Sequence, residues 1–342
     1  MRIALDATYS IGNALSGVGV YSREILHGLA REHPERRFEW CYRPHRFMRA
    51  LAGSGSMPHT TRLLWDPLWP RGVDLFHGLN QRLPRLRARR LVATFHDLFV
   101  LTGEYSTAEF RARFAEQARD AAARADAIIA VSGFTGQQVV ELLAVDARKV
   151  YVVHHGVRKL DLPGVQRENV ILNVGAIQKR KNIARLVKAF ETLPPQWRLV
   201  LAGSNGYGAG EILERIGSSP ARDRILITGY ISPEELAGWY GRARIFAFPS
   251  VDEGFGMPVL EAMQAGIPVV TSNRSALPEV AGDAALLVDP EDTGALAEAL
   301  RELVRNEDLR QDLALRGMAR AQIFTWQKAA RETWEVYHKV VG

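Results

Sequence analysis

Short apolar runs alternate with longer amphipathic stretches along the first half of the chain. Each run has four to six residues, which suits a strand that is buried on both faces of a parallel sheet. The predicted strands of this half cover residues 2–7, 73–77, 91–96, 127–131 and 150–154. The predicted helices cover residues 20–32, 107–124 and a segment that Ser132 caps and that ends near Leu143. This alternation predicts an α/β fold.

The same alternation starts again in the second half, after a break at residues 159–168 that contains Pro163 and Gly164. The predicted strands here cover residues 170–174, 198–202, 225–228, 245–249 and 269–271. The predicted helices cover residues 183–193, 294–306 and 307–323, and one more begins at Ser232. Ser232 and Glu235 have the spacing of a capping box, with Pro233 at the first helical position. The chain therefore has two similarly built halves.

Length and composition agree with two domains. At roughly 150 residues per domain, 342 residues suggest two of them. Hydrophobic residues make up 47% and charged residues 24%, which excludes a disordered, collagen-like or coiled-coil chain. We expect domains at residues 1–160 and 165–325, with a crevice between them, since open parallel sheets bind ligands beyond the carboxyl ends of their strands.

The cysteine count and the absence of apolar segments suggest a compartment. One cysteine, Cys41, excludes a disulfide framework and any cysteine-built metal site. The start of the chain has no apolar signal region, and no stretch of about 18 apolar residues could span a membrane. We therefore expect a cytoplasmic protein.

The charge is distributed unevenly between the halves. Residues 1–160 carry a net charge of +8 and the remainder −2, for a total of +6. A basic first half favours an anionic partner. A nucleic-acid-binding protein is one alternative, but the chain shows no basic stripe interleaved with aromatic residues and no known binding motif.

The first candidate segment for a binding or catalytic site follows the predicted strand at 245–249. Asp252 to Ala262 read DEGFGMPVLEA, a glycine-bracketed turn followed by a helix that Pro258 begins. The glycines allow a ligand close to the backbone, and the amides of a helix start favour an anion. Glu253 and Glu261 could grip two parts of one polyhydroxylated ligand. Alternatively, Glu253 is a solvated carboxylate on a turn and Glu261 is a carboxylate that the helix dipole stabilises near the start of the helix.

A second candidate is the basic loop GAIQKRKN, which runs from Gly175 to Asn182 after a predicted strand and before a predicted helix. Its three consecutive cations, Lys179, Arg180 and Lys181, make a natural cradle for a diphosphate. The Walker pattern is absent, so this is not a P-loop. A solvated basic loop is the alternative. We expect Lys181 and Glu253 on exposed loop ends.

Two weaker candidates lie in the first half. His96 ends a predicted strand, where a neutral imidazole could bind a substrate hydroxyl or move a proton. The loop from Ser16 to Tyr21, with Gly17 and Gly19, fits half of a dinucleotide fingerprint. Ser22 stands where the third glycine belongs, so we interpret it as a loop of backbone amides that faces phosphate rather than as an NAD site.

Together these segments closely resemble the retaining glycosyltransferases of family 4, and they do so in the same order along nearly the whole chain. Residues 249–266 are the most specific part of the resemblance. It implies the GT-B fold, in which two Rossmann-like domains face each other across a cleft. The closing stretch Phe324-Thr325-Trp326 looks like the start of the family's crossover helix, so residues 326–342 would return to the first domain.

The resemblance also implies roles for individual residues. In the family the second domain holds a nucleotide sugar and the first domain offers the acceptor. Arg180 and Lys181 would neutralise the donor diphosphate, and His96 would touch the transferred sugar. The remaining donor-binding residues would be Gly17, Gly19, Tyr230, Ile231, Glu253, Gly254, Phe255, Gly256, Met257 and Glu261. Of these, Glu253 would hold the sugar and Glu261 the ribose.

The resemblance narrows the choice of donor sugar nucleotide and of acceptor. The pattern looks most like bacterial mannosyl- and rhamnosyltransferases of surface polysaccharides, which favours GDP-mannose; a dTDP- or UDP-sugar is the alternative. Many relatives carry an arginine where this chain has Ala176, so the diphosphate charge would rest on the next cations. We expect no metal, because the chain contains no Asp-x-Asp triplet. The acceptor would be a glycan or a saccharide on polyprenyl diphosphate.

Such an acceptor would place the protein at a membrane. The basic regions 31–49 and 82–90 would suit peripheral contact with the anionic inner face of the inner membrane. A GT-B nucleotide-sugar 2-epimerase is a further alternative, although the Glu253/Glu261 spacing and the Gly-Phe-Gly turn favour transfer.

Overall fold

The computed structural model describes residues 1–12, 15–52, 57–65, 72–85, 88–162 and 164–342, and it divides the chain into two compact units. The first unit comprises Met1–Thr102, Thr107–Gly156 and Phe324–Gly342. The second comprises Gly103–Ser106 and Val157–Ile323. Pro163, part of the predicted break between the halves, lies outside the described residues.

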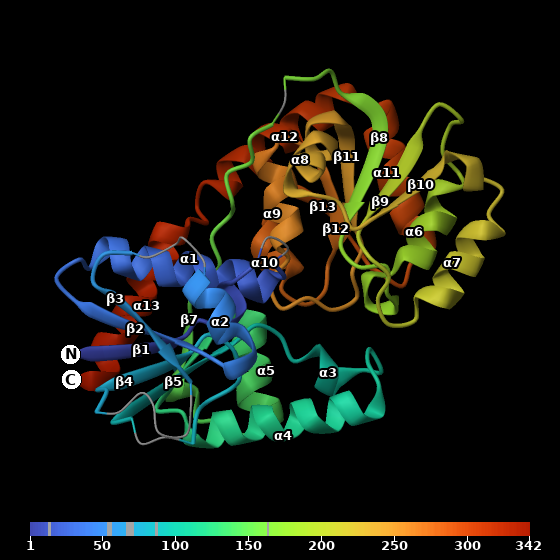
Figure 1. The fold of residues 1–342 in the computed structure, drawn as a ribbon. Helices are drawn as coiled ribbons and strands as arrows, with labels where there is room; N and C mark the ends of the chain where they lie inside the picture. Colours follow the sequence, from blue (N-terminus) through green and yellow to red (C-terminus); the bar gives the residue numbers. More distant parts are fainter. Residues whose placement is uncertain (13–14, 53–56, 66–71, 86–87, 163) are drawn as a thin grey trace. The chain divides into compact units, whose positions relative to one another are not determined.

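The first unit is built on a parallel sheet with strand order β3-β2-β1-β4-β5-β6-β7 (Figure 1). Its strands are β1 (Arg2–Asp6), β2 (Arg37–Tyr42), β3 (Thr60–Leu64), β4 (Leu75–Gly78), β5 (Arg90–Phe95), β6 (Ala127–Ala130) and β7 (Val150–Val152). Its helices are α1 (Gly17–Glu32), α2 (Pro44–Ala52), α3 (Phe99–Thr102), α4 (Ala108–Arg124), α5 (Gly133–Leu143) and α13 (Trp326–Val341), with the 3₁₀ turns η1 (Thr8–Ser10) and η2 (Ala147–Lys149).

Helices cover both faces of this sheet because neighbouring residues of a strand point to opposite sides. In β6, Ile129 packs in a cluster with residues of α1 and α13, whereas Ile128 packs with residues of α4 and α5. Both isoleucines and the two alanines that flank them in β6 are buried, which explains the uninterrupted apolar run in the sequence. The last helix, α13, therefore belongs to the first unit.

The second unit repeats this design, with strand order β10-β9-β8-β11-β12-β13, again all parallel. Its strands are β8 (Glu168–Val174), β9 (Arg198–Ala202), β10 (Ile225–Gly229), β11 (Ala243–Phe248), β12 (Val269–Ser272) and β13 (Ala285–Val288). Its helices are α6 (Ile183–Phe190), α7 (Ala209–Gly217), α8 (Pro233–Arg242), α9 (Met257–Gln264), α10 (Leu277–Ala281), α11 (Thr293–Arg305) and α12 (Glu307–Ala321), with η3 (Lys179–Lys181) and η4 (Arg222–Arg224).

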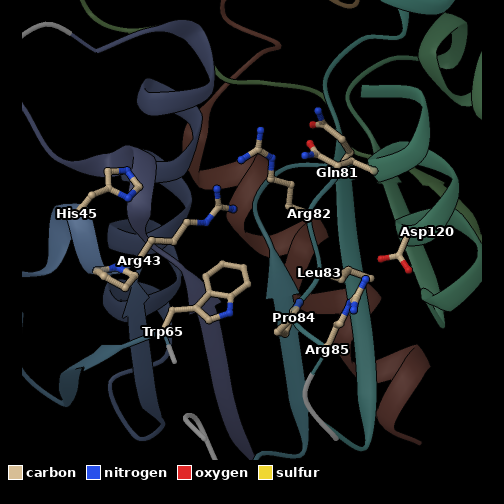
Figure 2. A pocket seen from close by; sticks show the side chains of 11 residues that line it. Arg43, His45, Trp65, Gln81, Arg82, Leu83, Pro84, Arg85 and Asp120 are labelled. Atoms are coloured by element: carbon tan, nitrogen blue, oxygen red, sulfur yellow. The ribbon is translucent and has the colours of Figure 1, made fainter. Parts of the chain in front are cut away.

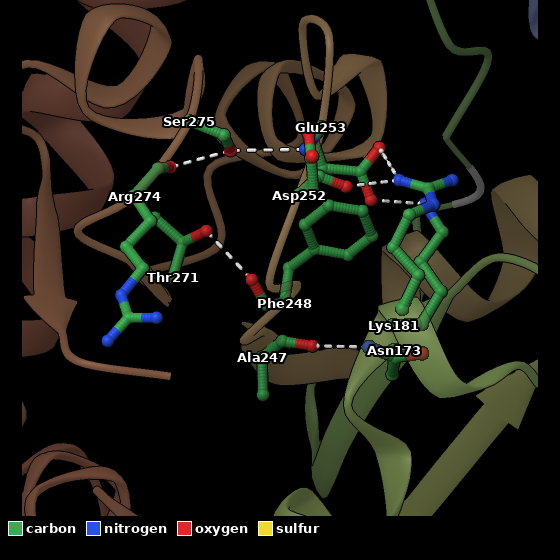
Figure 3. A network of polar contacts seen from close by, with 10 residues as sticks. Asn173, Lys181, Ala247, Phe248, Asp252, Glu253, Thr271, Arg274 and Ser275 are labelled. Carbon is green, nitrogen blue, oxygen red and sulfur yellow. Dashed lines mark hydrogen bonds and ion pairs between the residues drawn. The ribbon is translucent and has the colours of Figure 1, made fainter. Parts of the chain in front are cut away.

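In each sheet the strand order reverses beside the first strand, between β1 and β4 in one unit and between β8 and β11 in the other. Ligands of open parallel sheets bind outside the carboxyl ends of the strands at such reversal points. The residues after β8 and β11 carry a polar cluster (Figure 3), and those after β2, β3 and β4 line a cavity (Figure 2). These two places are the structural candidates for ligand binding.

Candidate functional site

The loops after β8 and β11 bring one carboxylate and two cations together. Glu253 follows β11, and its two carboxylate oxygens form ion pairs with two of the three cations of η3. Lys181 Nζ lies 2.6 Å from Oε1, and an Arg180 guanidinium nitrogen lies 2.9 Å from Oε2. Figure 3 shows this cluster, in which the Lys181 and Glu253 side chains point toward each other. The structure thus joins three of the four residues that the sequence predicts to be catalytic.

All three side chains are buried. The exposed fraction is 7% for Arg180 and 8% for both Lys181 and Glu253, so the expectation of exposed loop ends is wrong. The loops fold inward because they bond to each other: the Arg180 guanidinium donates to the Asp252 carbonyl, and the Val251 N–H donates to the Arg180 carbonyl at 2.9 Å. The ion pairs with Glu253 then compensate the positive charges of Arg180 and Lys181 that this folding buries.

The charge state of the cluster follows from its geometry. Burial alone would raise the pKa of the Glu253 carboxyl, but the charges of Arg180 and Lys181 outweigh it and lower this pKa to about 2. The Lys181 ammonium also lies 4.6 Å from the centre of the Phe248 ring, a favourable cation–π distance. Glu253 is therefore ionised at neutral pH and pairs with both cations.

The turn after Glu253 is shaped by a glycine that no other residue replaces easily. Gly256 has φ +101°, and a Cβ there would lie 2.7 Å from the side chain of Leu277. The Glu253 N–H donates to Ser275 Oγ at 3.1 Å, which fixes the start of the turn. The turn, which includes Gly254 and the buried Phe255, delivers the chain to Met257, the first residue of α9, whose first-turn amides are suited to an anion.

Glu261 lies one turn into α9 and already has partners. It accepts a hydrogen bond of 2.9 Å from the Tyr240 hydroxyl and pairs with Arg158 at 3.4 Å. Burial raises the pKa of Glu261, against the effects of Arg158 and Tyr240. A carboxylate has about four lone-pair positions, so these contacts orient Glu261 without using all of them. The side chain is held ready for a further hydroxyl donor.

The other predicted donor residues lie farther along the same sheet edge. Tyr230 and Ile231 follow β10, which β9 separates from β8, and the Tyr230 side chain is 63% exposed. Lys179 turns away from Glu253 and pairs with Glu211 of α7 at 2.9 Å. Arg180 and Lys181 are thus the cations of this basic loop that face Glu253.

Sequence reasoning missed the residue that holds the basic loop to the rest of the sheet. Asn182 has φ +58°, a left-handed conformation that asparagine tolerates better than most residues. Its side-chain amide donates to the carbonyls of Pro249 at 3.1 Å and Pro290 at 2.6 Å. An asparagine directly before a helix is a signal for such a turn, but its distant partners leave no mark in the sequence.

In the first unit, the predicted glycine loop is part of a helix. Helix α1 begins at Gly17 because Ser16 caps it, accepting a hydrogen bond of 3.3 Å from the Gly19 N–H. The interpretation of residues 16–19 as a loop is therefore wrong, and the amides of Gly17 and Gly19 belong to the first turn of α1. Gly19 is required there, since a Cβ would lie 2.8 Å from the Tyr9 carbonyl oxygen.

His96 follows β5 and is neutral. Its Nε2 lies 2.9 Å from the Leu79 carbonyl oxygen, so this nitrogen carries the proton and donates it. Nδ1 is then an acceptor, and it is buried without a partner among the residues that the structure describes. Burial lowers the pKa of His96 to about 4, despite the bond to Leu79. This imidazole is suited to accepting a hydrogen bond from a ligand hydroxyl.

A buried chain of hydrogen bonds, not foreseen from the sequence, runs from α13 toward His96. The Tyr337 hydroxyl lies 2.6 Å from His77 Nδ1, and His77 Nε2 lies 2.8 Å from Thr94 Oγ1. Thr94 in turn lies 2.9 Å from the Tyr21 hydroxyl, and the Tyr21 ring meets the His96 ring edge-on at 4.7 Å. The only sequence signal was a histidine at the end of an apolar run. This series of hydrogen bonds connects the last helix to the Tyr21 ring, which packs against His96.

No cluster of three or more His, Cys, Asp or Glu side chains in the described ranges is arranged to hold a metal ion. Within those same ranges, no helix combines the length and the apolar character that crossing a bilayer requires.

Comparison with known families gives matches over most of the chain. Residues 8–159 match the model described as Glycosyltransferase Family 4, and residues 161–320 match the model described as Glycosyl transferases group 1. The two matches cover the first and the second half in turn, as the two units of the structure do.

Individual proteins are also similar. An O-antigen chain mannosyltransferase B from Escherichia coli is 31% identical over 281 residues, which cover 77% of this chain and 74% of that protein. The serotype-specific mannosyltransferase WbdA of Escherichia coli is 28% identical over 64% of this chain, but the chain spans only 29% of its length. Among solved structures, sucrose-phosphate synthase from Thermosynechococcus elongatus has a TM-score of 0.77 at 23% identity, covering 99% of this chain and 98% of that one. This last similarity concerns the fold.

Proposed function

Since the chain belongs to glycosyltransferase family 4 and has the GT-B fold, we propose that it transfers mannose from GDP-mannose, with retention of anomeric configuration, to a saccharide acceptor of a surface polysaccharide. The family and fold agree with the resemblance found in the sequence. The choice of mannose is supported by the similarity to an O-antigen mannosyltransferase over 77% of the chain. The identity of the donor, the retention of configuration and the identity of the acceptor are what we propose beyond the family and the fold.

The observation that carries the proposal is the buried Glu253–Arg180–Lys181 cluster at the strand-order reversal of the second sheet. A nucleoside diphosphate becomes more negative as the bond to its sugar breaks. Preorganised cations lower that barrier, and removal of one such donor typically costs about 3–4 kcal/mol. Glu253 holds both cations in place before any ligand arrives, so they need no reorganisation during the reaction.

The same cluster supports attack from the face that the nucleotide leaves. Retaining hydrolases usually employ a carboxylate nucleophile. Glu253 is engaged by two cations and Glu261 is oriented by Tyr240 and Arg158, so we assign neither carboxylate the role of nucleophile. In the proposed reaction the acceptor hydroxyl attacks the anomeric carbon on this face, and its proton passes to the departing phosphate oxygen. Arg180 and Lys181 would stabilise that leaving group without a metal ion.

The direct test is a thermal-shift series on the purified protein with GDP, UDP, dTDP and their sugars, with and without EDTA. A ligand at 100 times its dissociation constant should stabilise the fold by about 2.7 kcal/mol. We expect GDP and GDP-mannose to raise the melting temperature equally well with EDTA present. A selective response to a UDP- or dTDP-sugar would replace mannose with another sugar, and no response to any nucleotide would refute the proposal.

A second assay separates transfer from epimerisation. In NMR spectra of GDP-mannose with protein and an oligomannoside acceptor, transfer gives GDP and a new anomeric signal with the α-configuration of the donor. An epimerase would instead change the sugar while it is still attached to the nucleotide or release it without a new linkage. A β-linked product would exclude retention.

We also propose that the first unit touches an anionic membrane surface. Helix α2 supports this, because it exposes Met48 (74%) and Leu51 (51%) in a segment that also carries Arg46 and Arg49. The second basic region gives less support: Arg89 pairs with Asp74 and Arg90 with Asp126, and Leu86 and Arg87 lie outside the described residues. Sedimentation with phosphatidylglycerol vesicles should capture the protein, and capture equal to that with neutral vesicles would refute the contact.

A further inference from the structure

The segment that follows β12 contacts the turn that carries Glu253 at three points (Figure 3). The Glu253 N–H donates to Ser275 Oγ at 3.1 Å, and the Ala276 N–H donates to the Glu253 carbonyl oxygen at 3.2 Å. The Leu277 side chain lies close to Gly256, where an added Cβ would be 2.7 Å from it. One short segment therefore holds the backbone of Glu253 on both sides and also shapes the glycine turn.

Ser275 occupies its place in a backbone conformation that serine rarely adopts. Its φ is +59°, in the left-handed region. Four described residues other than glycine have such a φ: His59 and Ala144 lie in the first unit, whereas Asn182 and Ser275 belong to the loops of the Glu253 cluster. Asparagine tolerates this region, but serine has no such preference. Strain of this kind persists only where the surroundings impose it, and it gathers at functional sites.

The hydroxyl of Ser275 has a fixed direction. It donates its own proton to the Arg274 carbonyl oxygen at 2.6 Å, which leaves its lone pairs for the Glu253 N–H. Arg274 in turn ties the segment to the residues after β13, because its guanidinium pairs with Asp289 and Glu291, each at 3.0 Å. The strained conformation and the hydroxyl are thus parts of one arrangement that ends at the Glu253 backbone.

The Glu253 backbone decides where the Glu253 carboxylate lies. That carboxylate reaches Lys181 at 2.6 Å and Arg180 at 2.9 Å, and all three side chains are buried. A buried ion pair depends on good geometry, since the protein around it replaces a lost partner poorly. A displacement of about 1 Å at a catalytic group can cost about a hundredfold in rate. The bond from Ser275 therefore acts on the two cations through Glu253.

We propose that Ser275 is a positioning residue for sugar transfer: its Oγ fixes the Glu253 backbone, and Glu253 in turn holds Arg180 and Lys181 where the departing diphosphate needs them. The proposal rests on the proposed function, because the two cations affect the rate only if a diphosphate leaves beside them. Glycine in place of Ser275 would remove the strain without supplying the Oγ. Substitution can therefore separate the effect of this residue on stability from its effect on the reaction.

The test compares Ser275→Gly with Ser275→Ala, both of which lack the Oγ. Glycine adopts a positive φ without strain and alanine does not, so the glycine variant should have the higher melting temperature. In both variants we expect kcat for GDP release, with an oligomannoside acceptor, to fall about ten- to a hundredfold while the KM for GDP-mannose stays unchanged. A purely structural role would instead make the loss of activity follow the loss of stability.

Ala144→Gly is the matched control. Ala144 ends α5 with a φ of +53°, and it belongs to the first unit. The substitution removes the same kind of strain without changing the Glu253 cluster, so it should raise the melting temperature and leave kcat as in wild type. A kcat lowered as much as in Ser275→Gly would mean that the rate responds to relief of strain anywhere, which would overturn the proposal.

A second readout needs no nucleotide. In protein labelled with ¹³C at the glutamate carboxyl, the NMR signal of Glu253 is the one that Glu253→Gln lacks. In wild type this signal should stay constant from pH 7 to about pH 4, because Arg180 and Lys181 hold the pKa of the carboxyl at about 2. In Ser275→Gly the carboxylate should lie less well between the two cations, so its pKa should rise and its signal should begin to titrate in that range.

Three further results would overturn the proposal: wild-type kcat in Ser275→Gly, a loss of kcat in Ser275→Ala alone, or identical titration of the Glu253 signal in wild type and Ser275→Gly. The second of these would assign the effect to the backbone conformation rather than to the Oγ. If the wild type turned over no nucleotide sugar, the proposed function would fail, and the NMR comparison would still decide whether Ser275 places the Glu253 carboxylate.

Discussion

Lys181 illustrates how one side chain can serve both structure and chemistry. Its ammonium is buried between the Glu253 carboxylate and the Phe248 ring, yet it belongs to the loop that the donor diphosphate would meet. Burial strengthens its interaction with any anion, because the surrounding medium screens charge less than water does. Loss of the Lys181 charge should therefore lower the rate of catalysis by more than its ion pair with Glu253 alone suggests.

We expect Lys181→Gln to lower the turnover number for sugar transfer by about 10²–10³-fold, because one preorganised cation is lost from the leaving group. The measurement is release of GDP from GDP-mannose at saturating donor. Lys188→Gln, on the exposed face of α6, is the matched control and should retain wild-type turnover. Equal turnover in the two variants would remove Lys181 from the proposed reaction.

Glu253 should make stability depend on acidic pH. Its carboxyl has a pKa of about 2 in the folded protein, against an ordinary value of 4.5. A carboxyl with a depressed pKa stabilises the fold above the unfolded pKa, and this stabilisation is lost as the pH falls from about 5 to about 2. The melting temperature of wild type should therefore drop over that range.

The variant Glu253→Gln should show a smaller drop, since it has no carboxylate to protonate, and should be less stable than wild type at pH 7, because Arg180 and Lys181 lose their partner. Asp223→Asn, which changes a carboxylate that is 90% exposed, should follow the wild-type curve. If the three curves ran parallel, the ion-pair cluster would not control acid stability.

At the scale of elements, the buried hydrogen bonds among β4, β5, α1 and α13 tie the first unit together. His77 is neutral, since burial lowers its pKa to about 3, so its ring donates at one nitrogen and accepts at the other. Both nitrogens have hydroxyl partners, Tyr337 and Thr94. Removal of one partner would leave a buried polar atom unsatisfied, which costs more than the bond itself contributes.

Tyr337→Phe should accordingly reduce the free energy of unfolding of the first unit by about 1–3 kcal/mol. Urea denaturation followed by tryptophan fluorescence measures this. Tyr151→Phe, in β7 of the same unit, removes a hydroxyl for which the described structure shows no hydrogen bond, and should leave the free energy of unfolding within error of wild type. An equal decrease in the free energy of unfolding of both variants would mean that the hydrogen bond between Tyr337 and His77 does not stabilise the fold more than the Tyr151 hydroxyl does.

The elements also show what a sequence can reveal. Strands such as β6 and β8 are buried on both faces, so their apolar runs were recognisable. β2 was missed because it contains the charged residue Glu39. In the structure Glu39 is nevertheless buried, and it forms an ion pair with Arg2. The candidate residues were found by type and spacing. Their burial was not, because Lys181 and Glu253 pair across 72 positions of sequence. Contacts that distant depend on the topology of the sheet.

At the scale of the molecule, the chain completes its second unit and then returns to the first through α13. The docking surface is tight. A Cβ on Gly28 of α1 would lie 2.8 Å from the Cβ of Ala330, and a Cβ on Gly156 would lie 2.2 Å from the backbone of Trp326. Small residues at these places let α13 approach closely, so the return of the chain is specified by packing as well as by the bond between Tyr337 and His77.

Gly28→Ala tests this docking against helix propensity. Alanine favours a helix over glycine by about 1 kcal/mol, so an unhindered substitution should stabilise the protein. Gly210 of α7 is such a position, since a Cβ there meets nothing within 4 Å. We expect Gly210→Ala to raise the melting temperature and Gly28→Ala to lower it, because overpacking costs about 1–3 kcal/mol and neither backbone can yield easily. Calorimetry on the full chain measures both. If Gly28→Ala stabilised the protein as Gly210→Ala does, α13 would not be packed against α1 in solution, and the first unit would have to be completed in another way.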